Sequence, residues 1–249
     1  MTAIKLKDIS TRAPEGYDKK ETKEKTAELL KELDELQYLM FAESKHSLLV
    51  VLQGLDASGK DGVIRNVFGS MNPQGVQVTS FKAPTEKELS HDFLWRVHAA
   101  APAKGSVAIF NRSHYEDILV TRVHQWCDDD TARKRMKAIN DFEELLTTHN
   151  NTSILKFYLH ISPEEQQERL QERIDDPVKQ WKYNAKDLEE AKRWNDYRRV
   201  YEDCFEHCSK VPWTIVPADQ NWYKEYIIAK KVRDTLVELK MQFPAIKKV

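Results

Sequence analysis

The feature that most constrains this chain is a loop bracketed by glycines, with a strand before it and a helix after it. Residues 48–52 (LLVVL) predict a buried parallel strand, and residues 63–71 predict a helix. Between them, residues 54–62 (GLDASGKDG) contain G-x-x-x-x-G-K, which forms a phosphate-binding loop in this context. Gly54 and Gly59 let successive N–H groups point at one anion, and Lys60 adds a full charge. Three of the chain's 7 glycines lie in these nine residues, which favours a phosphate cradle over an accidental turn.

The residue after Lys60 departs from the common pattern. A Ser or Thr hydroxyl usually helps to hold Mg²⁺ there, whereas this chain has the carboxylate of Asp61, with a second carboxylate, Asp56, inside the loop. Hard divalent cations prefer oxygen ligands, so Asp56 and Asp61 predict a metal site for Mg²⁺, with Mn²⁺ as an alternative. The competing interpretation is an ordinary strand-to-helix connection with a solvated Lys–Asp pair.

Composition predicts one large α/β domain in a soluble protein. The chain has 249 residues, of which 41% are hydrophobic and 32% charged. Its 39 Lys and Arg nearly balance its 40 Asp and Glu, so the overall charge indicates no nucleic-acid partner. We expect no membrane association, because no apolar run is long enough to cross a bilayer and the first 30 residues lack a signal-peptide core.

The cysteines are too few and too unevenly spaced for a disulfide framework, so the cytoplasm is the expected compartment. Cys204, His207 and Cys208 lie at helical spacing and could together contact a metal. Because a complete four-ligand zinc set is not evident, we expect packing roles instead.

Strands and helices alternate along the chain, which predicts a three-layer α/β/α fold with a five-stranded parallel sheet. Further strands are expected at residues 76–81, 107–110, 154–159 and 213–216. Helices are expected at residues 20–43, from the Thr85 cap to about Pro102, at 117–126 and 129–148, from Pro163 onward, and at 223–241. In the helix after Thr85, Glu88 completes a capping box, and four apolar residues are expected to face inward: Leu89, Phe93, Leu94 and Val97.

The expected domain spans residues 21–245, preceded by a polar arm at residues 1–20. The helix at 20–43 is amphipathic and is expected to pack on the sheet or against another subunit.

A second polar cluster follows the strand at 107–110, at the sheet edge where ligands bind in parallel sheets. Arg112 can form a bidentate contact with a phosphate. Asn111 stands where P-loop enzymes normally carry a metal-binding acid, so Asp61, Glu116 or Asp117 would supply the missing charge. The alternative is a helix cap with an exposed ion pair.

Residues 169–193 predict a lid that swings over phosphates and excludes water. Basic side chains recur through this segment, Pro177 interrupts it, and it has no clear apolar face. The phosphate-binding candidates are Arg169, Arg173, Lys179 and Lys182. A charged, solvated helical connector would look similar.

Several motifs together resemble the type 2 polyphosphate kinase family over about residues 28–245. They are GLDASGKDG (54–62), NPQGVQVTSFKAPTEKELSHDFLWR (72–96), FNRSHYEDILVTRV (110–123), LKFYLHISPEEQQERLQERIDDPVKQWKY (155–183) and VPADQNWYKEY (216–226). The resemblance implies a P-loop kinase fold similar to thymidylate kinases, with a mobile helical lid. It also implies Mg²⁺-dependent, reversible phosphoryl transfer between inorganic polyphosphate and nucleotides. The residues HYED (114–117) in the motif FNRSHYEDILVTRV are similar to those of groups that accept AMP, or both AMP and ADP. Whether GMP and GDP are also accepted is left open by the resemblance.

By this resemblance, the catalytic candidates are Asp56, Lys60, Asp61, Asn111, Arg112, Glu116 and Asp117, and the loop phosphate contacts are Gly54, Ala57, Ser58, Gly59 and Gly62. The nucleotide is expected near Lys82, Pro84 and Arg96. We also expect a homo-oligomer, either a dimer or a tetramer. Two rival functions are an ATP-dependent nucleoside monophosphate kinase and a P-loop nucleotide switch. The absence of an N/T-K-x-D guanine motif argues against the switch.

Overall fold

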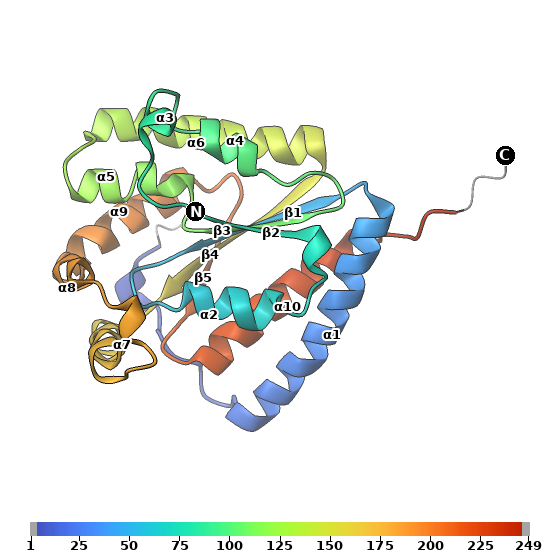
Figure 1. Cartoon of the computed structure of the whole chain (residues 1–249), viewed down its shortest axis with the longest axis horizontal. Coiled ribbons are helices and arrows are strands. Elements are labelled where there is room, and N and C mark those ends of the chain that lie inside the picture. Colours follow the sequence, from blue (N-terminus) through green and yellow to red (C-terminus); the bar gives the residue numbers. More distant parts are fainter. Residues whose placement is uncertain (1–3, 246–249) are drawn as a thin grey trace.

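A five-stranded sheet, all parallel, lies at the centre of the fold, which the computed structural model describes for residues 4–245. The strands are β1 (Ser47–Gln53), β2 (Val76–Ser80), β3 (Val107–Asn111), β4 (Thr152–His160) and β5 (Trp213–Pro217). Their order is β2-β3-β1-β4-β5 (Figure 1). All five expected strands are confirmed, and so is the parallel sheet.

The central position of β1 determines where a ligand can bind. Every residue of β1 is buried, because helices cover both faces and β3 and β4 flank its edges. In the register, Leu52 pairs with Asn111 and Gln53 pairs with Tyr158, so the loops after β1, β3 and β4 leave the sheet together. In an open parallel sheet this carboxyl edge is the ligand-binding edge.

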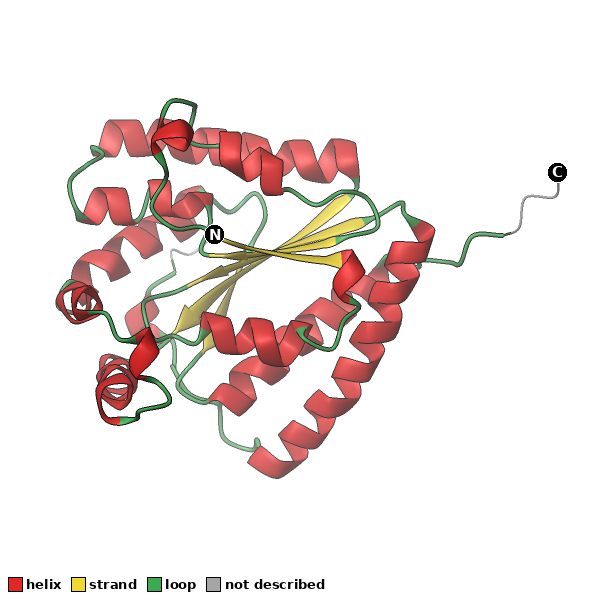
Figure 2. Cartoon of the chain, viewed as in Figure 1, coloured by secondary structure: helices red, strands yellow, loops and turns green. Residues whose placement is uncertain are grey.

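Helices form the outer layers and the region predicted as a lid, residues 169–193, which is called the lid region below. They are α1 (Lys19–Glu43), α2 (Lys60–Val63), α3 (Glu86–Leu89), α4 (Trp95–Ala100), α5 (Val120–Val123), α6 (Asp129–Asn150), α7 (Pro163–Asp175), α8 (Ala185–Ala191), α9 (Trp194–His207) and α10 (Asn221–Glu238). Figure 1 shows α1, α2 and α10 on one side of the sheet and α4, α6 and α9 on the other, while Figure 2 shows α7 and α8 beyond its carboxyl edge. The predicted three layers are therefore confirmed.

Three predicted helices differ from the structure. The helix after the glycine loop starts at Lys60 rather than residue 63, and it continues as a π-helical turn to Phe68. The helix expected at 117–126 is reduced to α5 after a 3₁₀ turn at His114–Asp117, and Gln125, at φ 59°, follows it in the left-handed region.

The helix capped by Thr85 is the third case. Its capping box with Glu88 is confirmed, but the helix ends at Leu89 and resumes at Trp95 as α4. Asp92 accepts a hydrogen bond from the Leu94 N–H at 2.9 Å, a local bond that competes with helix continuation. Leu89 is 69% exposed, so its predicted inward position is wrong, whereas Leu94 and Val97 are buried.

The N-terminal segment expected as a polar arm lies against the body of the fold. Leu6 is only 1% exposed, and its N–H donates to Glu202 at 2.9 Å. Thr11 donates to Asp219 at 2.7 Å, beside the turn that follows β5. Asp18 then caps α1, which packs along α10. This segment therefore belongs to the packed structure that supports the sheet's ligand-binding edge.

Cys127, Cys204 and Cys208 are buried free thiols, and Cys204 and Cys208 pack in the core as expected. Within residues 4–245, no group of three or more His, Cys, Asp or Glu side chains is arranged to hold a metal by itself. Across the same residues, every helix is too short or too polar to cross a membrane.

Candidate active site

The loop between β1 and α2 has the backbone geometry of an anion cradle. Gly54, Ala57 and Gly59 all have positive φ, at 150°, 62° and 95°. A Cβ on Gly54 would lie 2.9 Å from the Leu159 carbonyl oxygen, so the turn leaves no space for a side chain there. Alternating left-handed and right-handed residues turn consecutive N–H groups to one side, which is how a peptide concavity binds phosphate.

Lys60 begins α2 and is buried beneath this loop. Its Nζ donates to the carbonyl oxygens of Gly54 and Leu55 at 2.7 and 3.1 Å. Burial, followed by the nearby Arg112 guanidinium, lowers the pKa of Lys60 to about 8, while three carboxylates act in the opposite direction. An anion bound in the loop would favour the charged ammonium, because an opposite charge stabilises the protonated form.

The two loop carboxylates have different partners. Asp61 accepts a hydrogen bond from Asn111 Nδ2 at 2.8 Å, so its negative charge has a neutral partner there. Asp56 is paired with the Arg112 guanidinium, which also lies 3.6 Å from Glu116. Although burial opposes it, Glu116 and Asp56 raise the pKa of Arg112. Arg112 has φ 58°, an uncommon conformation for a non-glycine residue that is often found at functional sites.

Glu116 and Asp117 point into different regions, which sequence alone did not separate. Glu116 lies with Asp56 and Arg112 beside the phosphate loop. Asp117 lines a second cleft of about 150 Å³ with Arg96 and Arg135. Burial raises the pKa of Asp117, and these two arginines act in the opposite direction.

The expected nucleotide residues border this second cleft. Pro84, Phe93, Arg96 and Arg135 line it together with three carboxylates, Glu88, Asp92 and Asp117, so it offers apolar contacts and charges of both signs. Arg96 Nη1 donates to the carbonyl of Lys82 at 2.9 Å, and its guanidinium lies 5.3 Å from the centre of the Phe81 ring. Lys82 itself is exposed next to the cleft. The arrangement suits a molecule with an aromatic base and an anionic group.

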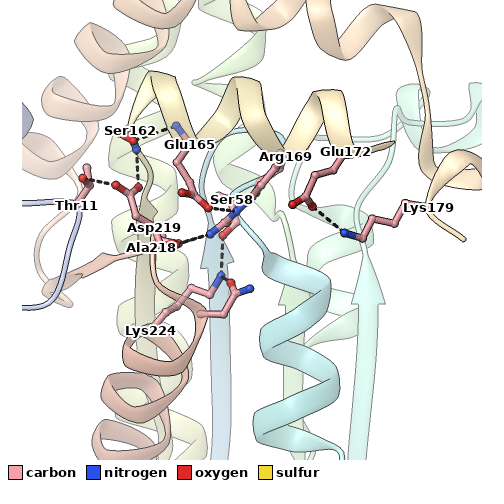
Figure 3. A network of polar contacts seen from close by, with 12 residues as sticks. Thr11, Ser58, Ser162, Glu165, Arg169, Glu172, Lys179, Ala218, Asp219 and Lys224 are labelled. Carbon is pink, nitrogen blue, oxygen red and sulfur yellow. Dashed lines mark hydrogen bonds and ion pairs between the residues drawn. The ribbon is translucent and has the colours of Figure 1, made fainter. Parts of the chain in front are cut away.

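The main cleft, about 630 Å³, lies between the phosphate loop and the lid region. Its lining includes all four basic lid candidates, Arg169, Arg173, Lys179 and Lys182, together with Asp56, Lys60, Asp61, Gly62, Asn111 and Arg112. Arg173 pairs with Asp187 at 2.7 Å, and Lys179 pairs with Glu172 at 2.7 Å (Figure 3 shows the second pair). Lys182 lies 5.0 Å from the ring centre of Trp181, whose side chain is 78% exposed.

A buried polar network, which the sequence analysis missed, lies under the motif at residues 110–123. Tyr115 donates to Glu143 at 2.6 Å, and Lys156 donates to both, at 2.7 Å to Tyr115 and 2.8 Å to Glu143. All three side chains are buried. A satisfied buried network of this kind rigidifies its surroundings, here the turn that carries Arg112, Glu116 and Asp117. The sequence did contain a sign of this network: Lys156 stands inside the apolar strand LKFYL (155–159), where a charged side chain needs buried partners.

Lys224 on α10 was also missed as a residue of the site. Its Nζ donates to the Ser58 carbonyl at 2.9 Å and to Asn221 Oδ1 at 2.8 Å (Figure 3). The signal in the sequence was its place soon after the last strand, which brings it to the ligand-binding edge.

The carboxylates present suit a magnesium ion better than a fully protein-ligated metal. Mg²⁺ keeps several waters and is usually held by one or two carboxylates together with substrate phosphates. Asp61, exposed at the cleft, and the nearby Asp56 provide that donor set.

Comparison with known proteins identifies the family. The profile of the family described as Polyphosphate kinase 2 (PPK2) matches residues 16–244. The AMP/ADP-polyphosphate phosphotransferase of Meiothermus ruber is 48% identical over 223 residues, which cover 89% of this chain and 83% of that protein. The ADP-polyphosphate phosphotransferase of Rhodopseudomonas palustris is 42% identical over 90% of this chain and 83% of that protein.

A solved structure agrees with this assignment. The crystal structure of Polyphosphate Kinase 2 from Arthrobacter aurescens TC1 superimposes with a TM-score of 0.96 at 42% identity. The match covers 100% of this chain and 90% of that one. The chain described here belongs to the polyphosphate kinase 2 family.

Proposed function

We propose that this protein transfers phosphoryl groups, reversibly and with Mg²⁺, between inorganic polyphosphate and nucleotides, with AMP and ADP as the main acceptors and GMP and GDP as further ones. One structural observation carries the proposal: a large cationic cleft over the phosphate loop adjoins a smaller cleft with apolar and arginine contacts. The first fits a polyphosphate chain and the second fits a nucleotide. The substrates in the names of the Meiothermus and Rhodopseudomonas relatives support the same assignment.

In the transfer, a terminal phosphate oxygen of the nucleotide attacks the end phosphorus of polyphosphate. The new P–O bond forms as the bridging P–O bond breaks, and the shortened chain leaves with the bridging oxygen as a terminal phosphate oxygen. The attacking phosphate is already largely ionised at pH 7, since its second pKa is roughly 6. No general base is needed, so positioning and charge neutralisation supply the catalysis.

Each group at the site has a role in this proposal. The N–H groups of the loop and Lys60 hold the phosphates around the transferred group, while Arg112 neutralises charge in the transition state. Arg173, Lys179 and Lys182 add positive charge from the lid, which closes over the chain and excludes water. Asp61, with Asp56, would hold a magnesium ion, which would neutralise phosphate oxygens when bound.

A test of donors and acceptors addresses the proposed function. The purified protein is incubated with Mg²⁺, long-chain polyphosphate and one of AMP, ADP, GMP or GDP, without ATP, and the products are separated by chromatography. We expect ADP from AMP and ATP from ADP. Efficient phosphorylation of a monophosphate by ATP, with polyphosphate inert, would instead indicate an ATP-dependent nucleoside monophosphate kinase. Binding without turnover would indicate a nucleotide switch.

We also retain two proposals that rest on the sequence alone, namely a homo-oligomeric state and a cytoplasmic location. Light scattering coupled to size-exclusion chromatography measures the first, and cell fractionation measures the second.

A further inference from the structure

The carbonyl oxygens of the phosphate loop are held from outside by three cations from three elements. Lys60 at the start of α2 binds the carbonyls of Gly54 and Leu55. Arg169 on α7 donates to the Ala57 carbonyl at 3.1 Å, and Lys224 on α10 donates to the Ser58 carbonyl at 2.9 Å. Figure 3 shows Arg169 and Lys224 approaching the loop from different helices. A carbonyl held outward turns the N–H of its own peptide to the opposite side, so the Gly59 N–H can face an anion. The Ser58 N–H instead donates to the Leu55 carbonyl at 3.2 Å.

Of these cations, Lys224 is the one that was neither a candidate from the sequence nor part of the proposed mechanism. It is 1% exposed, and its Nζ lies 2.2 Å from the position that a Cβ on Gly59 would occupy. The ammonium group therefore fills the space beside Gly59, directly under the Ser58–Gly59 peptide. Gly59 must lack a side chain both for its φ of 95° and for this contact.

The charge of Lys224 is poorly compensated by its surroundings. Both of its hydrogen bonds go to neutral oxygens, those of Ser58 and Asn221. Arg169 from α7 and Lys60 from α2 oppose its charge, whereas Glu225 on its own helix and Glu165 on α7 favour it. Burial, followed by the effect of Arg169, lowers the pKa of Lys224 to about 7. A buried ammonium in this position lacks the counter-charge that usually accompanies one.

We propose that Lys224 is a positioning residue of the polyphosphate site, one that fixes the Ser58–Gly59 peptide with its N–H toward the cleft and has its charge balanced by the bound polyphosphate chain. The inference rests on the proposed function, because it takes polyphosphate as the anion in the loop. Arg169 shares the carbonyl-holding role but is fixed by further bonds to Ala218 and Asp219 at 2.9 Å each.

Proton uptake on binding follows from this arrangement. Because the pKa of Lys224 is lowered to about 7, the free protein holds part of Lys224 in the neutral form near neutral pH. A polyanion above the loop favours the charged form and raises the pKa, so binding takes up protons. Other groups of the protein can also take up protons on binding, so the contribution of Lys224 is the difference between the wild-type protein and a variant.

The test compares Lys224→Met and Lys224→Gln with Lys230→Met. Lys230 is a matched control, because it lies on the same helix, is half-exposed and pairs with Asp234. Binding of long-chain polyphosphate with Mg²⁺ and without nucleotide is measured by calorimetry in buffers of different ionisation enthalpy. We expect the Kd and the KM for polyphosphate to rise about tenfold in Lys224→Met, as for the loss of a charge-assisted hydrogen bond. Proton uptake should fall, and the KM for nucleotide should stay unchanged.

Lys224→Gln separates the hydrogen bond from the charge. Gln keeps an uncharged N–H donor on a side chain one bond shorter than Lys, so we expect a smaller rise in Kd but the same loss of proton uptake. Lys230→Met should match the wild type in both readouts. If both Lys224 variants melt like the wild type and keep its Kd within twofold and its proton uptake, the inference is wrong. If the wild-type protein itself does not bind polyphosphate, the proposed function fails instead.

Discussion

At the scale of single residues, the carboxylates of the candidate site differ in what they are paired with: some face a guanidinium and one faces an amide. Arg112 joins two carboxylates, Asp56 and Glu116, across the loops after β1 and β3. Asp61, by contrast, has the neutral amide of Asn111 as its partner. An acid that is not matched by a cation remains available to a metal ion. In the proposed function, the magnesium role is therefore assigned to Asp61 before Asp56.

The first prediction concerns the carboxylate of Asp61. Asp61→Asn keeps the shape of the side chain but removes its charge, so the Mg²⁺ concentration needed for half-maximal activity should rise sharply, and activity at modest Mg²⁺ should collapse. Asp61→Ser restores the commoner loop sequence and should not rescue activity, because Asn111 offers no charge to share the metal. A Mg²⁺ titration of activity beside a thermal melt makes the measurement. A helix-dipole role alone would cost only about 0.3–1 kcal/mol of stability and leave the titration unshifted.

A second residue-scale prediction uses the separation of the two clefts. Arg96→Ala removes a guanidinium from the smaller cleft and should raise the KM for nucleotide about tenfold, with the KM for polyphosphate unchanged. Lys182→Ala, in the larger cleft, should raise the KM for polyphosphate and leave the KM for nucleotide unchanged. Steady-state kinetics with each substrate varied in turn gives both constants. A parallel shift of both KM values in either variant would contradict the assignment of one substrate to each cleft.

At the scale of elements, α7 connects the core to the lid. Its N-cap, Ser162, accepts from Glu165 N, and Pro163 follows in the first turn. The first half of α7 is fixed through Arg169 to the phosphate loop, whereas Arg173, one turn later, pairs with Asp187 of α8. The helix thus carries one arginine that is tied to the loop and one that is tied to the lid.

The third prediction tests Arg173 in the closed state. Arg173→Ala should lower kcat by about 10²-fold or more, with a smaller effect on KM, as expected for a charge that acts in a water-excluded site. Lys192→Ala is the matched control, since that side chain is 70% exposed and pairs with Glu189 on the surface. Single-turnover measurements separate the chemical step from product release. Unchanged kinetics in Arg173→Ala would contradict a role in the transition state and would mean that this arginine is part of a solvated surface helix.

Strands could be predicted from the sequence far better than helices. Runs such as Leu48–Leu52 are apolar on both faces, as buried parallel strands must be. The helix after Thr85 was predicted too long, because the hydrogen bond from Leu94 N to Asp92 is a local choice that periodicity does not reveal. In the candidate site, the motif residues could be singled out from the sequence, but Lys224 could not. Its role depends on how α10 packs under the loop, which is a property of the tertiary structure.

At the scale of the whole molecule, the N-terminal segment stabilises the functional edge of the sheet. His160 at the end of β4 lies 3.1 Å from the Leu6 carbonyl and 3.2 Å from the Ile9 carbonyl. Thr11 contacts Asp219, whose other carboxylate oxygen accepts from Ser162 N at the start of α7 (Figure 3). The polar composition of residues 1–20 concealed these contacts, because a single buried leucine anchors the segment.

The fourth prediction follows from that anchor. Leu6→Ala should lower the free energy of unfolding by about 2 to 5 kcal/mol, the usual range for a buried leucine truncated to alanine. Leu89→Ala serves as the control, because this leucine is 69% exposed and its loss should change stability by about 0.5 kcal/mol or less. Urea unfolding gives both values. Equal stability of the two variants would mean that the segment is detached in solution.

The contacts that hold the phosphate loop also determine how late in translation the chain can bind a phosphate there. The loop occupies residues 54–59, but its Ala57 and Ser58 carbonyls are held by residues 169 and 224, which are translated much later. A nascent chain that ends before α10 therefore contains the whole glycine motif without the side chain that fixes its last peptide. On the proposed role of Lys224, translation must pass α10 before the cradle is complete, so shorter nascent chains are expected to bind polyphosphate poorly.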